Sequence, residues 1–166
     1  MVIDLTNLFN GADEVIPVDY AFNISDLIFD TYNPLKEPVH VNGRFYQEAG
    51  VVQCSLDVQF VFDGYCDRCA EPVHKLYHFP VQKVFVTHLD NGDDFEDYIV
   101  TGSAGIDLDV FIREEILLFL PSKILCREDC KGLCPKCGKN LNEGSCDCKK
   151  DIDPRMEALL QLLDEE

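Results

Sequence analysis

The sequence contains no tryptophan, only two methionines and few basic residues. Its 14 lysines and arginines stand against 31 aspartates and glutamates, so the formal net charge is −17 in a chain of 166 residues. Such a chain repels phosphate groups unless its cations gather in one place, which excludes a uniformly basic surface for nucleic acid. An acidic surface instead suits a basic partner protein, or serves only to keep the protein in solution.

Long apolar runs are absent as well. No run approaches the roughly 20 residues that a helix needs to cross a bilayer, so no membrane association is expected. The stretch Met1–Asp4 lacks the basic segment of a secretory signal, which favours a cytoplasmic protein. Hydrophobic residues make up 46% of the chain, enough for the core of one ordinary domain and unlike a disordered acidic protein.

Alternation of apolar and polar residues predicts a sheet. The clearest strand has one apolar face, formed by Cys54, Leu56, Val58, Phe60 and Phe62. We interpret Cys54 as a small core residue and not as a ligand. Similar patterns predict antiparallel strands near residues 38–46 and 73–87, and a change of phase near 80–84 indicates a bulge or an edge position.

Helical spacing follows the strands. Apolar residues recur at Leu108, Ile112 and Ile116, and Pro121 ends the pattern. A second amphipathic stretch begins at Asp153 and carries Met156, Leu159, Leu160 and Leu163. The sequence therefore predicts an α+β fold: a β-rich antiparallel body over residues 1–125 with one packed helix near 108–120, then a small cysteine-rich zinc-binding module with a short C-terminal helix over 126–166.

Cysteine is the most informative residue type. Six of the nine cysteines lie within residues 126–148, which in a reducing compartment indicates metal binding before disulfides. A secreted disulfide framework is the competing interpretation, but an odd number of cysteines leaves one unpaired. The run Cys134-Pro-Lys-Cys137-Gly138 is typical of a zinc knuckle, in which two thiolates reach one metal across a tight turn and glycine adopts a positive φ.

A tetrahedral zinc site takes four ligands, so the cluster offers more than one ion needs. We expect Cys134 and Cys137 to bind together with either Cys126 or Cys130 and with either Cys146 or Cys148. The sequence leaves the choice within each of these flanking pairs open. Four thiolates leave no position for water, which indicates structural zinc; an iron–sulfur cluster is the alternative. The candidate ligands are Cys126, Cys130, Cys134, Cys137, Cys146 and Cys148.

The Cys66-x2-Cys69 pair admits two interpretations. It forms a second knuckle, for which His74 and His78 are candidate partners, or it is a hairpin turn with two ordinary thiols, which we favour. A thioredoxin-like redox pair would need a helix after the motif, and the alternating run from Val73 does not provide one. No histidine lies in a recognisable catalytic arrangement, so we predict no enzyme activity and no small-molecule substrate.

Three motifs resemble the YceD family, named as the large ribosomal RNA subunit accumulation protein. The first is the turn Cys66-Asp67-Arg68-Cys69. The second joins Ile106-Asp107-Leu108 to Arg113–Leu118 and Leu120-Pro121. The third is Cys130–Gly138, followed by Asn140-Leu141-Asn142, by the pair Cys146 and Cys148, and by Ile152–Arg155. The three follow in family order from about residue 38 to the C-terminus.

The resemblance implies a non-enzymatic cytosolic factor that supports accumulation of large-subunit ribosomal RNA and ribosome assembly. Its partner is a ribosomal protein held by the acidic body, or a large-subunit rRNA precursor. The precursor would be contacted at Arg68 and at the lysines Lys131, Lys136, Lys139, Lys149 and Lys150. Residues 126–150 carry a formal charge of +2 and the other 141 residues carry −19, which favours the ribosomal protein. A thiol-based redox enzyme or an RNA-processing enzyme is the alternative.

Overall fold

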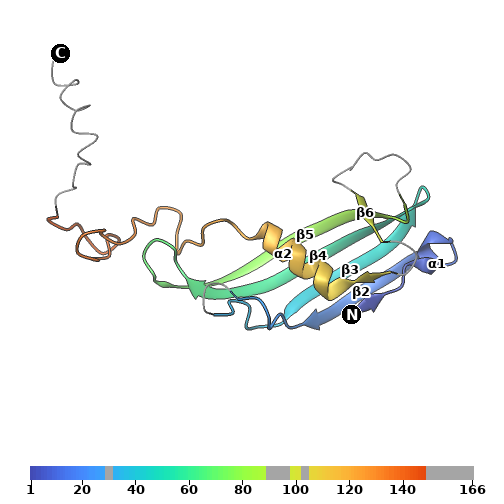
Figure 1. Cartoon of the computed structure of the whole chain (residues 1–166), viewed down its shortest axis with the longest axis horizontal. Coiled ribbons are helices and arrows are strands. Elements are labelled where there is room, and N and C mark those ends of the chain that lie inside the picture. The colour runs from blue at the N-terminus through green and yellow to red at the C-terminus, as the bar shows by residue number, and fades with distance from the viewer. Residues whose placement is uncertain (29–31, 89–97, 102–104, 149–166) are drawn as a thin grey trace, which may run out of the picture.

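The computed structural model describes residues 1–28, 32–88, 98–101 and 105–148. Its main element is a five-stranded sheet in the order β2-β3-β4-β5-β6 (Figure 1). These strands are β2 (Val15–Phe22), β3 (Val39–Glu48), β4 (Val51–Tyr65), β5 (Pro72–Val86) and β6 (Tyr98–Val100). A separate pair joins β1 (Val2–Ile3) to β7 (Ile106–Asp107), and the helices are α1 (Thr6–Phe9) and α2 (Leu108–Phe119).

The two longest strands, β4 and β5, position the candidate site at the turn between them. Their antiparallel register runs without interruption from Val52 opposite Phe85 to Tyr65 opposite Pro72. Of the two alternatives predicted near residues 80–84, the bulge is therefore wrong and the edge position holds. Pro80 lies where no further described strand pairs with β5, which is the edge position that a strand proline tolerates.

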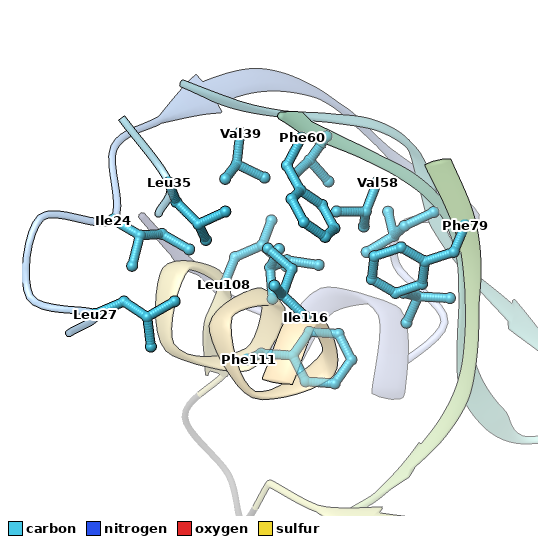
Figure 2. Close-up of a cluster of buried hydrophobic side chains, with 14 of the residues drawn as sticks. Ile24, Leu27, Leu35, Val39, Val58, Phe60, Phe79, Leu108, Phe111 and Ile116 are labelled. Carbon is cyan, nitrogen blue, oxygen red and sulfur yellow. The ribbon is translucent and has the colours of Figure 1, made fainter. Parts of the chain in front are cut away.

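The core lies between one face of the sheet and α2. Alternate residues of β4 are buried because the strand has a period of two, and the helix presents one apolar stripe to them. Figure 2 shows the sheet residues Val58, Phe60 and Phe79 facing the helix residues Leu108, Phe111 and Ile116. The predicted helix near 108–120 is thus confirmed as a packed core element.

The ends of α2 follow from its flanking residues. The Asp107 carboxylate accepts a hydrogen bond from the backbone N–H of Asp109 at 3.1 Å, which satisfies one of the free donors of the first turn. Leu120 is already extended, because the proline that follows cannot continue the helix. The chain then leaves the sheet and runs past the β4–β5 turn (Figure 1).

The structure corrects the predicted fold class in two respects. The sheet is mixed, because β6 pairs with β5 in parallel, whereas the prediction was antiparallel throughout. Besides α2 there is the four-residue helix α1, which is too short to show helical periodicity in the sequence. The C-terminal helix predicted from Asp153 onward lies outside the described residues.

Candidate metal centres

Eight of the nine cysteines gather in two groups, and within each group the four sulfur atoms lie within 4.8 Å of one another. The first centre consists of Cys66, Cys69, Cys126 and Cys130, and the second consists of Cys134, Cys137, Cys146 and Cys148. Cys54 stays apart in the core, where burial raises its pKa to about 11, and its predicted role as a core residue is confirmed.

The turn between β4 and β5 supplies half of the first centre. The backbone N–H of Ala70 donates to the carbonyl of Cys66 at 2.9 Å, and the N–H of Cys66 donates to the carbonyl of Glu71 at 2.8 Å. Ala70 adopts a φ of 58°, a value at which an L-residue is strained. The turn is therefore held in a specific knuckle geometry at the end of a long, rigid hairpin.

The second centre contains the same turn. The N–H of Gly138 donates to the carbonyl of Cys134 at 2.9 Å, and the N–H of Cys134 donates to the carbonyl of Lys139 at 2.8 Å. Gly138 has a φ of 71°, as the sequence predicts for the residue after the second cysteine. Because the two turns match bond for bond, Cys66–Cys69 has the backbone geometry of a second knuckle, which favours this interpretation over the ordinary turn that we preferred.

The two residues inside the first knuckle hold the cysteine tail, which we define as residues 121–148. The carboxylate of Asp67 accepts from the N–H of Ile124 at 2.6 Å, and the N–H of Asp67 donates to the carbonyl of Ile124 at 2.8 Å. The guanidinium of Arg68 donates to the carbonyl of Cys130 at 2.7 Å. These bonds bring Cys126 and Cys130 of the tail to the hairpin.

Two asparagines connect the centres. The side-chain amide of Asn142 donates to the sulfur of Cys130 at 3.3 Å, and its oxygen accepts from the N–H of Lys131 at 2.8 Å. The amide of Asn140 donates to the carboxylate of Glu71 in the hairpin at 3.2 Å. Asn142 therefore orients a sulfur of the first centre from a loop of the second, and sequence reasoning did not assign it this role.

The sulfur geometry fits a tetrahedral metal ion. Zinc–thiolate bonds of about 2.3 Å in a tetrahedron place sulfur atoms about 3.8 Å apart. In the first centre the sulfur atoms of Cys66 and Cys130 are 3.7 Å apart, and those of Cys69 and Cys126 are 3.6 Å apart. These separations far exceed the roughly 2.05 Å of a disulfide, and all nine cysteines are free thiols.

The electrostatics of both centres also call for a cation. Burial alone would raise the pKa of Cys66, but backbone hydrogen bonds at Cys126, Arg68 and Cys69 lower it to about 6. Burial and its thiol neighbours raise the pKa of Cys126 to about 12. Four clustered thiols cannot all ionise without a positive ion between them, whereas a divalent metal stabilises every thiolate.

In the second centre, too, one thiol has a lowered pKa and another has a raised pKa. Backbone hydrogen bonds at Cys137 and Lys136 lower the pKa of Cys134 to about 6. The hydrogen bond to Cys137, together with burial, raises the pKa of Cys148 to about 12. Donors at the knuckle sulfur are the usual outer partners of a thiolate ligand, because they offset its negative charge.

The structure groups the predicted ligands differently from the sequence analysis, which expected one residue from each flanking pair around a single ion. Both Cys126 and Cys130 join the hairpin, and both Cys146 and Cys148 join Cys134 and Cys137. The histidines considered as partners are not members of either centre: the ring of His78 lies 3.3 Å from the carboxylate of Asp57. Metal binding by these cysteines stays a prediction.

A comparison with protein families decides what kind of chain this is. The family described as "Large ribosomal RNA subunit accumulation protein YceD" matches residues 54–163, a span that includes both centres. The chain belongs to the YceD family. The predicted resemblance is thereby confirmed, and the YceD match covers more than half of the chain.

Relatives of this YceD protein come from several bacteria and from plants. "Uncharacterized protein YlbN" of Bacillus subtilis (strain 168) is 30% identical over 132 residues, covering 76% of this chain and 74% of the relative. "Large ribosomal RNA subunit accumulation protein YCED homolog 1, chloroplastic" of Zea mays is 38% identical over 145 residues, covering 69% of this chain and 50% of the relative.

A mycobacterial relative, from Mycobacterium tuberculosis (strain ATCC 25618 / H37Rv), is 32% identical over 103 residues, covering 60% of this chain and 50% of its own. The chain thus spans about half the length of the mycobacterial and maize proteins. No solved structure shows a significant match. Among the described residues, no helix is long and apolar enough to cross a membrane.

Proposed function

We propose that this YceD-family protein is a non-enzymatic cytoplasmic factor that supports accumulation of large-subunit ribosomal RNA and hence ribosome assembly. The observation that carries the proposal is the family match, together with the name of the maize relative. The closed four-thiol centres agree with a non-enzymatic role, because a metal with four thiolate ligands has no open position for substrate or water.

Each centre holds one structural zinc ion in this proposal. Zinc supplies no reaction here; it links chain segments, and the first centre joins the β4–β5 hairpin to the tail while the second closes the tail on itself. Asp67, Arg68 and Asn142 orient the first set of ligands by the hydrogen bonds described above. An iron–sulfur cluster on the same thiolates would show iron and visible absorbance in the purified protein.

The acidic body is the proposed contact for a basic ribosomal protein. Outside residues 126–150 the chain carries 27 acidic and 8 basic residues, a net of −19, which attracts basic proteins and repels RNA. The test is capture of the tagged full-length protein from native lysate with and without RNase. A ribosomal protein that remains after RNase supports the proposal. A capture that contains no component of the large subunit would overturn it.

A thiol-based redox enzyme is the second candidate. The observation in its favour is the lowered pKa, about 6, of Cys66 and Cys134, since low-pKa thiols are reactive when accessible. Titration with a thiol reagent of the folded, metal-loaded protein separates the two. Structural centres leave all eight thiols protected until a chelator is added, whereas a redox enzyme shows one pair that reacts at once.

A further inference from the structure

A cleft lies between the first half of β5 and the start of the cysteine tail. Its volume is about 440 Å³, and its walls come from residues 72–77 on one side and 121–128 on the other. Figure 1 shows this part of the tail running from α2 past the β4–β5 turn. The cleft is unusual for so acidic a chain, because its lining contains Lys75, Lys123 and Arg127 against a single carboxylate, that of Glu128.

The lysine on the sheet side is held in place by an aromatic ring. The ammonium of Lys75 lies 4.9 Å from the ring centroid of Tyr77, a cation–π contact. Tyr77 is itself fixed, because its ring stacks on Phe60 at 5.3 Å and meets Phe119 edge-on at 5.9 Å. Lys75 therefore lies at the cleft wall with its ammonium over a ring that is itself packed.

The cations on the tail side are positioned by the first centre. Lys123 directly precedes Ile124, whose backbone makes two hydrogen bonds to Asp67, and Arg127 directly follows the candidate ligand Cys126. Arg127 has a carboxylate partner, the exposed Asp129 at 3.3 Å. Because the tail is fastened to the hairpin at both points, its cations face Lys75 across a preorganised gap.

The lack of a carboxylate partner distinguishes Lys75 and Lys123 from the other lysines of the body. Lys36 pairs with Asp63, Lys83 with Glu115 and Arg113 with Asp26 at distances of 2.7 to 3.4 Å. Within the described part of the chain, neither Lys75 nor Lys123 has a carboxylate at ion-pair distance. The cleft is thus lined by the two lysines of residues 1–125 that have no carboxylate at ion-pair distance in the described structure, together with Arg127, which Asp129 partly neutralises.

We propose that this cleft binds the phosphate backbone of single-stranded RNA, with Lys75, Lys123 and Arg127 each contacting a phosphate. The inference rests on the proposed function and names its RNA-contacting site. A basic ribosomal protein is repelled by these cations, so the acidic body and the cleft recognise different partners. An RNA strand meets repulsion on the acidic faces of the body and attraction at the cleft, which orients it toward the cleft.

The test measures binding of a fluorescein-labelled single-stranded RNA of mixed sequence to the metal-loaded full chain over a series of salt concentrations. Three phosphate contacts give a slope of log affinity against log salt of about −2, at about −0.7 per contact. The double variant Lys75→Gln with Lys123→Gln loses two contacts, so we expect a slope of about −0.7. If the wild type and the double variant bind equally at 1 M salt, this difference in slope makes the double variant bind about 25-fold more weakly than the wild type near 0.1 M salt.

Two matched variants remove the same charge elsewhere. Lys36→Gln removes an exposed lysine that Asp63 already neutralises, and Lys139→Gln removes a lysine of the tail whose ammonium contacts the Ser145 carbonyl. The wild-type slope is about −2, and both control variants should keep at least four fifths of it. Unchanged binding by the double variant, or an equal loss in either control, overturns the inference. Circular dichroism and metal content confirm that all variants are folded.

Failure of the inference can be told from failure of the proposed function. In cells depleted of the protein, large-subunit rRNA is measured after expression of the wild type or the double variant. Restoration by the wild type and not by the double variant supports both proposals. Restoration by both overturns the cleft and leaves the proposed function standing. No restoration by the wild type overturns the proposed function, while the salt slopes still decide whether the cleft binds RNA.

Discussion

The sheet and the cysteine tail are stabilised by different means. The sheet and its helix bury a continuous apolar core that includes Phe45, Phe60, Phe85, Ile112 and Ile116. In the described part of the tail, the buried hydrophobic residues are Ile124 and the two cysteines Cys130 and Cys134. A segment with so little apolar burial cannot offset its conformational entropy by packing, so the tail depends on its hydrogen bonds and, in the proposal above, on metal ions bound by its cysteines.

The largest expected effect comes from removing one ligand of the first centre. Cys69→Ser should lower the bound metal from two ions per chain to one, because an alcohol is a poor ligand for zinc. The tail should then become open to proteolysis, while the β-sheet signal in circular dichroism persists. Metal analysis and limited proteolysis measure the two effects. Cys54→Ala is the control, and loss of metal in that variant would contradict the assignment.

A change in the apolar core should have the opposite result: it should lower the stability of the sheet and leave the metal content unchanged. Ile116→Ala removes a fully buried side chain of α2 and should lower the free energy of unfolding by about 2–5 kcal/mol in urea titrations. Leu118→Ala, at a position 78% exposed on the same helix, should change it by less than about 0.5 kcal/mol. Both variants keep two metal ions. A loss of metal from Ile116→Ala would show that the two regions are not independent.

A smaller effect is expected at the junction between the centres. Asn142→Ala removes the amide that donates to the sulfur of Cys130, and such outer-shell changes weaken metal affinity by about 10–100-fold. Competition with a chromophoric chelator measures this loss. Asn42→Ala, on the exposed polar face of the sheet, is the matched control. Equal affinities in the two variants would mean that the hydrogen bond does not orient the ligand.

The smallest effect concerns the pH dependence of the sheet. Because burial raises the pKa of Cys54 to about 11, the folded state keeps this thiol neutral where the unfolded chain ionises it. The contribution of the Cys54 thiol to the free energy of unfolding is fully present below the pKa of about 9 in the unfolded chain, and it is lost as pH rises toward 11. The wild type should therefore lose more stability over this interval than Cys54→Ala. Parallel pH profiles would contradict the stated cause.

The sequence predicts those parts of the structure that depend on local periodicity. The alternation through β4 and the helical spacing of Leu108, Ile112 and Ile116 correspond to elements with the expected buried faces. The parallel pairing of β6 could not be predicted, because alternation identifies a strand but not the direction of its neighbour. The four residues of α1 are too few for a helical period to show.

The grouping of the cysteines lay beyond local sequence for a different reason. The knuckle spacing identifies Cys134 and Cys137, but the partners of Cys66 and Cys69 are 64 and 57 residues away in the chain. Only the tertiary path of the tail brings them together. The signal that was available is the identical C-x2-C spacing of Cys66–Cys69, although the residue after it is Ala70 where the other motif has Gly138.

The most direct test of the account is native mass spectrometry of the full-length protein purified without chelators. With both centres occupied, the mass should exceed that of the reduced polypeptide by two zinc ions, less the protons that the thiolates release, and Cys69→Ser should lose one ion. A wild-type mass with no metal, with a single ion, or with the hydrogen deficit of disulfides would contradict it.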